Sequence, residues 1–255
     1  MKQKIKSGVN KISAVIALLS AELFLVLFSF FISLAVLIIV IRKIFFHKEY
    51  TMDEQVFSYL SHYVTDTNTM IMQFISFFGS HLFLVPAWLM VLTFYFFTRK
   101  NKWYFIKLVI ISISNLGMMF GLKYFFNRPR PLIPLLKEVP GLSFPSGHAF
   151  MSLIFFGMII YMLYHGVKNK WVKWGSISLL VIIIFFVGFS RVYLRVHFAS
   201  DVIAGFCFGV LSLMIQMWLL RRIEKFNAEK IPHHLNVTRA GNDLPGIKSY
   251  EGLAE

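Results

Sequence analysis

The sequence predicts an all-α membrane protein with six transmembrane helices and an extracytoplasmic interfacial helix between the first two. Three observations lead to this prediction. The composition is 57% hydrophobic with 29 phenylalanines, long apolar stretches recur along the chain, and basic residues gather in the connections between them. Such a composition is more apolar than that of an ordinary soluble domain. We therefore expect a lipid bilayer as the solvent of this chain.

Six stretches reach the length of about 20 apolar residues that a spanning helix needs. They cover residues 12–41, 79–97, 103–126, 147–165, 172–192 and 200–220. The start of the chain up to Ala21 also resembles a secretory signal peptide, but its apolar run continues to Ile41. That run is longer than the roughly 7 to 15 residues of a signal peptide, so we expect it to remain as a span.

The basic residues, which give the chain a net charge of +14, sort by side of the membrane. With the N-terminus inside, the cytoplasmic connections contain Lys2, Lys4, Lys6, Lys11, Arg99, Lys100, Lys102, Lys168, Lys170, Lys173, Arg221, Arg222 and Lys225. An excess of positive charge in alternate connections is typical of cytoplasmic loops. The pattern predicts that both termini are cytoplasmic, and it argues against nucleic acid as the partner of these charges.

The connection between the first two spans, residues 47–78, carries apolar residues at helical spacing among polar ones. This pattern predicts an interfacial helix, with a surface loop as the alternative. Thr51-Met52-Asp53-Glu54 matches a capping box, in which a threonine hydroxyl and a glutamate carboxylate accept backbone N–H groups at a helix start. We expect the helix to begin there.

The end of the chain, residues 227–255, loses the apolar periodicity and contains Pro232, Gly241, Pro245 and Gly246. Such a segment buries too little surface to offset its chain entropy, so we expect a disordered cytoplasmic tail. Residues 1–226 are expected to form one membrane domain with a core at about residues 79–220.

Three groups of polar residues lie at the connections between the spans of this core. In the first, Lys123 and Arg130 lie at the end of the third span, before Pro131. Arginine offers a planar fork of donors and lysine a compact charge, a combination suited to a phosphoryl group. Basic residues at a helix end also commonly extend toward lipid headgroups, and that reading stays open.

In the second group, Pro145, Ser146, Gly147 and His148 directly precede or begin the fourth span. The free backbone N–H groups of a helix start bind anions, and a glycine there lets a ligand approach closely. His148 could donate a proton to a leaving oxygen. The alternative is a serine that only caps the helix.

In the third group, Ser190 and Arg191 are followed by His197 and Asp201. A spacing of four residues places His197 and Asp201 on one face of a helix, where the carboxylate could fix the imidazole tautomer and leave the other nitrogen free to attack. A purely structural pair is the alternative. The first two groups lie between spans three and four and the third between spans five and six, so all three emerge on the outer side.

Together these residues resemble a known signature. Lys123-x6-Arg130-Pro131, Pro145-Ser146-Gly147-His148 and Ser190-Arg191-x5-His197-x3-Asp201 are similar to the three-part signature of the type 2 phosphatidic acid phosphatase superfamily. The resemblance implies that His197 is the nucleophile that forms a phosphohistidine, that Asp201 orients it and that His148 protonates the leaving group. It assigns phosphate binding to Lys123, Arg130, Ser146, Gly147 and Arg191. It implies no metal and no cofactor.

The resulting expectation is an integral membrane lipid phosphatase with an extracytoplasmic site. By resemblance, its substrate would be phosphatidic acid, phosphatidylglycerophosphate or undecaprenyl diphosphate. A lipid A phosphatase or a lipid phosphotransferase with the same site is an alternative enzyme. A non-catalytic anion channel or transporter is the alternative from another class, although conduction requires no nucleophile such as His197. The sequence does not indicate an oligomeric state.

Overall fold

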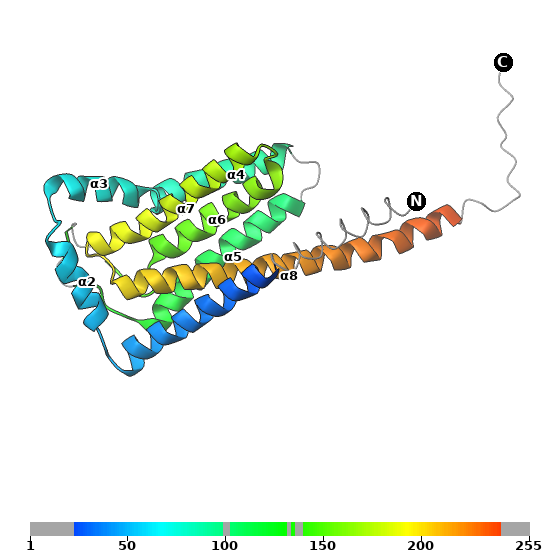
Figure 1. Ribbon diagram of the computed structural model, residues 1–255. Coiled ribbons are helices and arrows are strands. Elements are labelled where there is room, and N and C mark those ends of the chain that lie inside the picture. The colour runs from blue at the N-terminus through cyan, green and yellow to red at the C-terminus, as the bar shows by residue number, and fades with distance from the viewer. Residues whose placement is uncertain (1–22, 99–102, 132–133, 136–139, 241–255) are drawn as a thin grey trace, which may run out of the picture. The chain divides into compact units, whose positions relative to one another are not determined.

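The computed structural model describes residues 23–98, 103–131, 134–135 and 140–240, and all regular structure in these ranges is helical (Figure 1). Six helical segments are long and apolar enough to cross a membrane: Leu23–Phe46, Asp66–Thr98, Phe105–Phe126, Gly147–Gly166, Lys170–Tyr193 and Ala199–Ile223. The predicted all-α fold with six spans is therefore confirmed. The start of the first predicted span and the N-terminal lysines lie outside the described residues.

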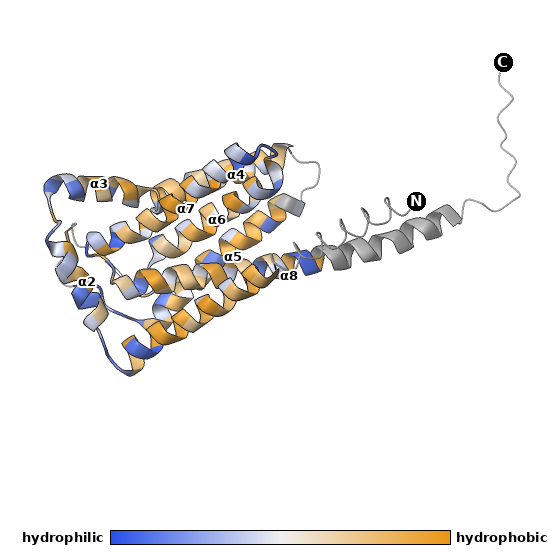
Figure 2. Ribbon diagram, viewed as in Figure 1, coloured by the Kyte–Doolittle hydropathy of each residue, from blue (hydrophilic) through white to orange (hydrophobic). Residues whose placement is uncertain are grey.

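The helices follow one another with short connections except between α5 and α6, which are joined by residues 127–146. The first segment ends in a π-helical turn, η1 (Arg42–Phe46). The remaining helices are α2 (Thr51–Ser61), α3 (Asp66–Phe77), α4 (His81–Thr98), α5 (Trp103–Phe126), α6 (Gly147–Gly166), α7 (Lys170–Tyr193) and α8 (Ala199–Ala240). Hydrophobic residues cover the outward faces of the long helices (Figure 2), and Trp171, for example, is 90% exposed. Apolar faces of this kind are compatible with lipid rather than with water.

The predicted connection, residues 47–78, contains two helices, α2 and α3, instead of the one that the sequence predicts, and α3 begins the second apolar segment, Asp66–Thr98. The predicted capping box does not form, because Tyr50 is the N-cap of α2 and no side chain caps it. Asp53 is instead buried, at 2% exposure. The true side-chain cap belongs to α3, where the Thr65 hydroxyl accepts the Asn68 N–H at 3.1 Å. That these helices lie on the outer side of the membrane stays a prediction.

Helix α2 runs across one end of the long helices (Figure 1). Its Leu60 packs in one buried cluster with Ala149 of α6, Val192 of α7 and Val202 of α8. A buried leucine contributes about 2 kcal/mol relative to an exposed one, so this contact holds α2 against the bundle. The helix ends that meet here contain the second and third polar groups of the sequence.

A second buried cluster anchors the loop that precedes α6. Phe144 is fully buried and packs with Leu37 and Ile44 of the first segment and with Ala204 of α8. Because Phe144 is fixed on three sides, Ser146 and Gly147 follow it at a defined position. Apolar packing therefore positions the start of α6 without help from polar contacts.

Helix α8 continues to Ala240, so residues 227–240 are helical in the structure and differ from the predicted disorder. Ala228, Glu229 and Lys230 are good helix formers and extend an existing helix without a new nucleation step, whereas Pro232 opposes the helix. Residues 241–255 lie outside the described residues, and the cytoplasmic side of the tail stays a prediction.

Candidate active site

The first polar group is held by backbone carbonyls of the loops before α6 and before α8. Lys123, in the last turn of α5, donates from Nζ to Leu142 O at 2.7 Å and to Pro145 O at 3.1 Å. Arg130 donates from Nε to Gly141 O at 3.2 Å and from Nη1 to Val196 O at 2.9 Å. An ammonium has three donors and a guanidinium five, so both side chains retain donors for a ligand.

The second polar group forms the start of α6, as predicted. Ser146 is the N-cap, its N–H donates to Asp201 O at 3.0 Å, and its side chain makes no capping hydrogen bond. Its hydroxyl is buried and has no hydrogen-bond partner within the described ranges. An orphan hydroxyl beside the free N–H groups of a helix start is an arrangement that accommodates an anion.

A Schellman motif ends α7, and it lies between Arg191 and His197 of the third polar group. The Val196 N–H donates to Arg191 O at 3.2 Å, and the Arg195 N–H donates to Val192 O at 3.0 Å. Arg195 occupies the left-handed position of this motif with φ of 53°, where glycine is the usual residue. The His197 N–H also donates to Arg191 O, at 3.2 Å. The end of α7 therefore fixes the backbone of His197.

Asp201 lies in the first turn of α8 and reaches back to the helix start. Its Oδ2 accepts the Phe198 N–H at 3.0 Å, as the acidic residue of a capping box does. The Ser143 hydroxyl also donates to Oδ2, and Arg128 Nη1 donates to Oδ1 at 2.6 Å. With 0% exposure, this carboxylate is buried and has donors on both oxygens.

His197 lies between a carboxylate and a guanidinium. Its Nδ1 is 3.6 Å from Asp201 Oδ2 and 3.4 Å from the Ser143 hydroxyl. The first distance exceeds the roughly 3.2 Å of a normal N–H···O hydrogen bond, so Ser143 is the closer partner in this structure. Nε2 lies 3.4 Å from Arg130 Nη1. The predicted pair of His197 and Asp201 is thus brought together, with Ser143 beside both.

The surroundings of His197 keep its imidazole neutral. Burial lowers the pKa of His197 from 6.5 to about 4, and Arg130 and Arg191 act in the same direction while Asp201 opposes them. Burial also lowers the pKa of Arg130, which Asp201 partly offsets. A neutral imidazole carries a free lone pair, and this is the form that can attack an electrophile.

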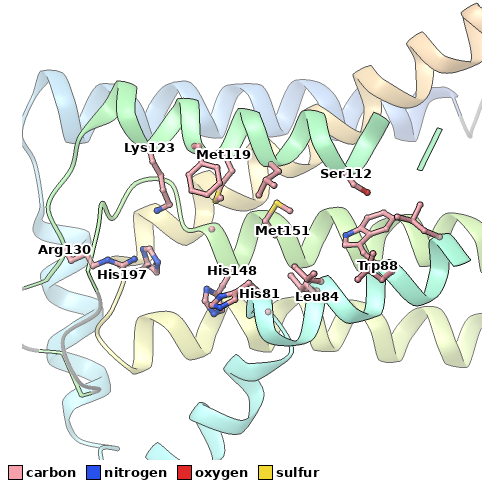
Figure 3. Close-up of a pocket in the computed structure, with 17 residues that line it drawn as sticks. His81, Leu84, Trp88, Ser112, Met119, Lys123, Arg130, His148, Met151 and His197 are labelled. Carbon is pink, nitrogen blue, oxygen red and sulfur yellow. Dashed lines mark hydrogen bonds between the residues drawn. The ribbon is translucent and has the colours of Figure 1, made fainter. Parts of the chain in front are cut away.

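A cavity of about 440 Å³, here called the inner cavity, connects these groups with an apolar wall. Figure 3 shows Lys123, Arg130, His148 and His197 gathered at one end and Leu84, Trp88 and Ser112 toward the other. Of the eight predicted site residues, five line this cavity: Lys123, Arg130, Gly147, His148 and His197. An elongated apolar ligand with one anionic end would fit this distribution.

The other three predicted residues lie behind the cavity wall. Asp201 supports His197, and Ser146 directly precedes Gly147. Arg191 is 5% exposed and donates from Nη1 to the Ser76 hydroxyl at 2.5 Å. Its Nε is buried and has no hydrogen-bond partner in the part of the chain that the structure describes. Phosphate binding by Arg191 stays a prediction.

A second hollow of about 670 Å³, here called the outer cavity, lies on the α2 side. Its lining includes Tyr50, Ser58, Arg128, Arg195 and Phe198. Arg130 lines both cavities and therefore stands at their boundary. Arg128 is accessible from this hollow although it is only 6% exposed.

The fold brings to the site several residues to which the sequence assigned no catalytic or binding role. Ser143 and Arg128 bind Asp201, Asp53 binds Arg128, and His81 lines the inner cavity beside His148. Arg128 lies two residues before Arg130, and this proximity was the available signal. Asp53 and His81 carry no local signal, because their partners are far away in sequence.

The described residues contain no group of three or more His, Cys, Asp or Glu side chains that could hold a metal ion. The site instead concentrates Lys123, Arg130 and Arg191 with a helix start around a neutral histidine. Phosphoryl transfer depends chiefly on positioning and on stabilising charge at the equatorial oxygens. This arrangement has the components that such a reaction requires: an imidazole that could attack, cations, and a second imidazole that could transfer a proton.

Comparisons with known proteins give a consistent result. The family model described as PAP2 superfamily matches residues 103–225. Phosphatidylglycerophosphatase B of Bacillus subtilis (strain 168) is 31% identical over 163 residues, which cover 61% of this chain and 77% of that protein. The bacitracin transport permease protein BcrC of Bacillus licheniformis is 30% identical over 179 residues, covering 67% and 73%.

A solved structure is also similar. The crystal structure of the first transmembrane PAP2 type phosphatidylglycerolphosphate phosphatase from Bacillus subtilis superposes with a TM-score of 0.68 at 25% identity. The match covers 77% of this chain and 98% of that chain. The residues matched by the family model, 103–225, include all three polar groups.

Proposed function

The chain belongs to the PAP2 superfamily, and from this membership we propose its substrate and the role of each site residue in the reaction. It is a multi-pass membrane protein and a lipid phosphate phosphatase. We propose that it removes the terminal phosphate of phosphatidylglycerophosphate, phosphatidic acid or undecaprenyl diphosphate. The active site faces the extracytoplasmic side, and both termini are cytoplasmic.

The observation that carries this proposal is the shape and lining of the inner cavity. Leu84, Trp88 and Leu116 supply an apolar wall, while His148 and His197 lie at the opposite end. An acyl or prenyl chain already lies in lipid, so an apolar wall can accept it from the bilayer without exposing it to water. The same chain would place its phosphate against the cationic end. Phosphatidylglycerophosphate is the first candidate. It has acyl chains for the apolar wall and a terminal phosphate for the cationic end, and the B. subtilis relatives bear its name.

In the first step, the His197 Nε2 lone pair forms a bond to phosphorus and the bond from phosphorus to the lipid oxygen breaks. The leaving oxygen takes a proton from protonated His148, so the lipid departs as a neutral alcohol or, from a diphosphate, as a monophosphate. Lys123 and Arg130 neutralise charge on the equatorial oxygens. The positive charge that develops on the His197 ring is stabilised by Asp201 and Ser143.

In the second step, a water molecule attacks the phosphorus of the phosphohistidine from the side that the lipid has left. Neutral His148 takes one proton from this water, and the bond from phosphorus to His197 Nε2 breaks. Inorganic phosphate and neutral His197 are regenerated, and His148 is again protonated for the next substrate. The protein's own cations supply the electrostatic stabilisation in both steps.

The experiment that tests this function uses detergent-purified protein with a lipid panel. Phosphate release from phosphatidylglycerophosphate, phosphatidic acid, undecaprenyl diphosphate and lipid A is measured with and without EDTA. We expect release from at least one of the first three, unchanged by EDTA and abolished in His197→Ala. Absence of release from all four lipids by folded wild-type protein would refute the proposal.

The same reactions distinguish hydrolysis from transfer. Product analysis in the presence of alcohol acceptors reports where the phosphoryl group goes. Free phosphate supports hydrolysis, whereas a phosphorylated acceptor in its place would identify a phosphotransferase. Persistence of full activity in His197→Ala would show that the phosphohistidine route is wrong.

A further inference from the structure

A buried chain of charges extends from the active site to α2. Arg128 is 6% exposed and Asp53 2% exposed, and Asp201 is fully buried. Arg128 donates from Nη1 to Asp201 Oδ1 at 2.6 Å and from Nη2 to Asp53 Oδ2 at 2.9 Å. One guanidinium therefore bridges a carboxylate of the active site and a carboxylate of α2.

Asp53 has a second set of contacts, all to Ser200. Its Oδ1 accepts the Ser200 N–H at 2.9 Å and its Oδ2 accepts the Ser200 hydroxyl at 2.6 Å. Ser200 belongs to the first turn of α8, so Asp53 caps this helix start from another helix. Arg128 Nη1 also donates to the Ser200 hydroxyl, at 2.9 Å. The start of α8, and with it Asp201, is held from the α2 side.

The contact with Arg128 also limits how the Asp201 carboxylate can rotate. A carboxylate can rotate about its bond to Cβ unless both oxygens are engaged. Here Arg128 binds Oδ1, while the Phe198 N–H and the Ser143 hydroxyl donate to Oδ2, the oxygen that faces His197. The face of the guanidinium is further fixed by the Phe198 ring, whose centroid lies 4.0 Å from Cζ. The orientation of Asp201 toward His197 thus depends on a residue that does not line the inner cavity.

From these contacts we propose that Arg128 is a positioning residue that acts through Asp201, and that Asp53 holds Arg128 in that position. The inference rests on the proposed phosphohistidine function. A purely structural role, in which the three charges only attach α2 to the bundle, makes a different prediction. It would lower stability and leave the turnover of the folded enzyme unchanged, whereas a positioning role lowers turnover.

The test compares Arg128→Gln with a control that removes one positive charge from the same outer cavity. Arg195→Gln is that control, because no contact of the Arg195 side chain to the site is observed among the described residues. Arg128→Gln is expected to lower kcat on the order of 10- to 100-fold with KM changed less than about threefold, as partners that orient reactive ligands do. Arg195→Gln is expected to retain kcat within about twofold.

A double-mutant cycle separates the two roles. In an Asp201→Asn background, Arg128→Gln should reduce kcat by less than about threefold, because residues that act through one another are strongly non-additive. An equal reduction in both backgrounds would overturn the proposal. Asp53→Asn supplies a second variant if Arg128→Gln does not fold, and it should lower kcat about 10-fold. Wild-type kcat in folded Asp53→Asn would overturn the role of Asp53.

Two further measurements do not depend on which lipid is the substrate. Equilibrium binding of vanadate, a phosphate analogue that reacts with a neutral histidine, should weaken at least 10-fold in Arg128→Gln. Added ethylguanidinium should restore affinity in Arg128→Ala, since the outer cavity of about 670 Å³ gives access to the vacated position. If the wild type binds vanadate but hydrolyses no lipid, the proposed function fails while these measurements still decide the inference. Unchanged vanadate affinity in Arg128→Gln would refute it.

Discussion

A close approach of α8 to the backbone at the start of α6 predicts a specific effect of one methyl group. Gly205 of α8 faces the start of α6, and a Cβ added there would lie 2.8 Å from Ser146 O. It would also lie 3.2 Å from Ala149 Cβ and 3.4 Å from Phe150 N. Gly205→Ala therefore pushes on backbone atoms of the helix start that carries Gly147 and His148, and these atoms cannot rotate away as a side chain can.

The expected loss of kcat in Gly205→Ala follows from these distances. An ordinary contact begins at about 3.4 Å, so the Ser146 carbonyl and the turn attached to it must shift by about 0.6 Å. A misplacement of about 1 Å in a catalytic geometry can cost about 100-fold in rate. We expect Gly205→Ala to lower kcat about 10-fold or more, because His148 and the free N–H groups of α6 move together. Overpacking of this kind also lowers the free energy of unfolding by about 1 to 3 kcal/mol.

Gly209→Ala is the matched control for this variant. Gly209 lies one turn further along α8, and its added Cβ would meet Leu153, with Cδ2 at 3.0 Å and Cβ at 3.4 Å. A leucine side chain can change its rotamer, so the backbone of α6 stays in place. Both variants gain the same helix propensity, about 1 kcal/mol, which cancels in the comparison. Phosphate release and thermal unfolding in detergent are measured for both. A folded Gly205→Ala protein as active as Gly209→Ala would refute the reasoning.

Three other predictions concern His197 and its neighbours. The pKa of His197, lowered by burial to about 4, predicts that its contribution to kcat/KM stays constant from neutral pH down to about pH 4 and is lost below, since only the neutral ring attacks. Arg130→Gln should raise that pKa and move the acid limb to higher pH; pH profiles of both proteins on one substrate check this, and an unshifted limb contradicts it. Arg195→Gly should raise the free energy of unfolding by about 1 kcal/mol by relieving the left-handed backbone, whereas Arg195→Ala should not, as denaturation in detergent would measure. Ser143→Ala should lower kcat about 10-fold with little change in KM, because it removes a donor to Asp201 and leaves that carboxylate short of one hydrogen bond; a kcat equal to wild type would exclude this role.

The spans could be predicted because the bilayer imposes a local rule. Every backbone N–H in lipid must be satisfied within its own helix, so length and apolarity alone reveal a span. The fourth predicted stretch, residues 147–165, agrees with α6 to within one residue, and Gly147 begins the helix as expected. The clusters around Arg130, His148 and His197 could also be predicted, since their chemistry is carried by residues close together in sequence.

The connection from residue 47 to residue 78 shows where local rules fail. Thr51 and Glu54 match a capping box, yet the helix start is not capped by either side chain. Asp53, between them, instead binds Ser200, which lies 147 residues away. Nothing local distinguishes an aspartate that faces water from one that pairs with a distant helix start. The same limit applies to Ser143, whose partner Asp201 is 58 residues away.

The charges on the two sides of His197 determine which of its nitrogens can attack. Nδ1 faces Ser143 and the Asp201 carboxylate, and Nε2 faces Arg130. A neutral imidazole has one N–H, and on Nδ1 it finds acceptor oxygens, whereas on Nε2 it would point at a guanidinium that accepts nothing. The tautomer with the proton on Nδ1 is therefore favoured. The lone pair then lies on the cationic side, where a phosphate dianion is also attracted, so nucleophile and electrophile are brought together by the same asymmetry of charge.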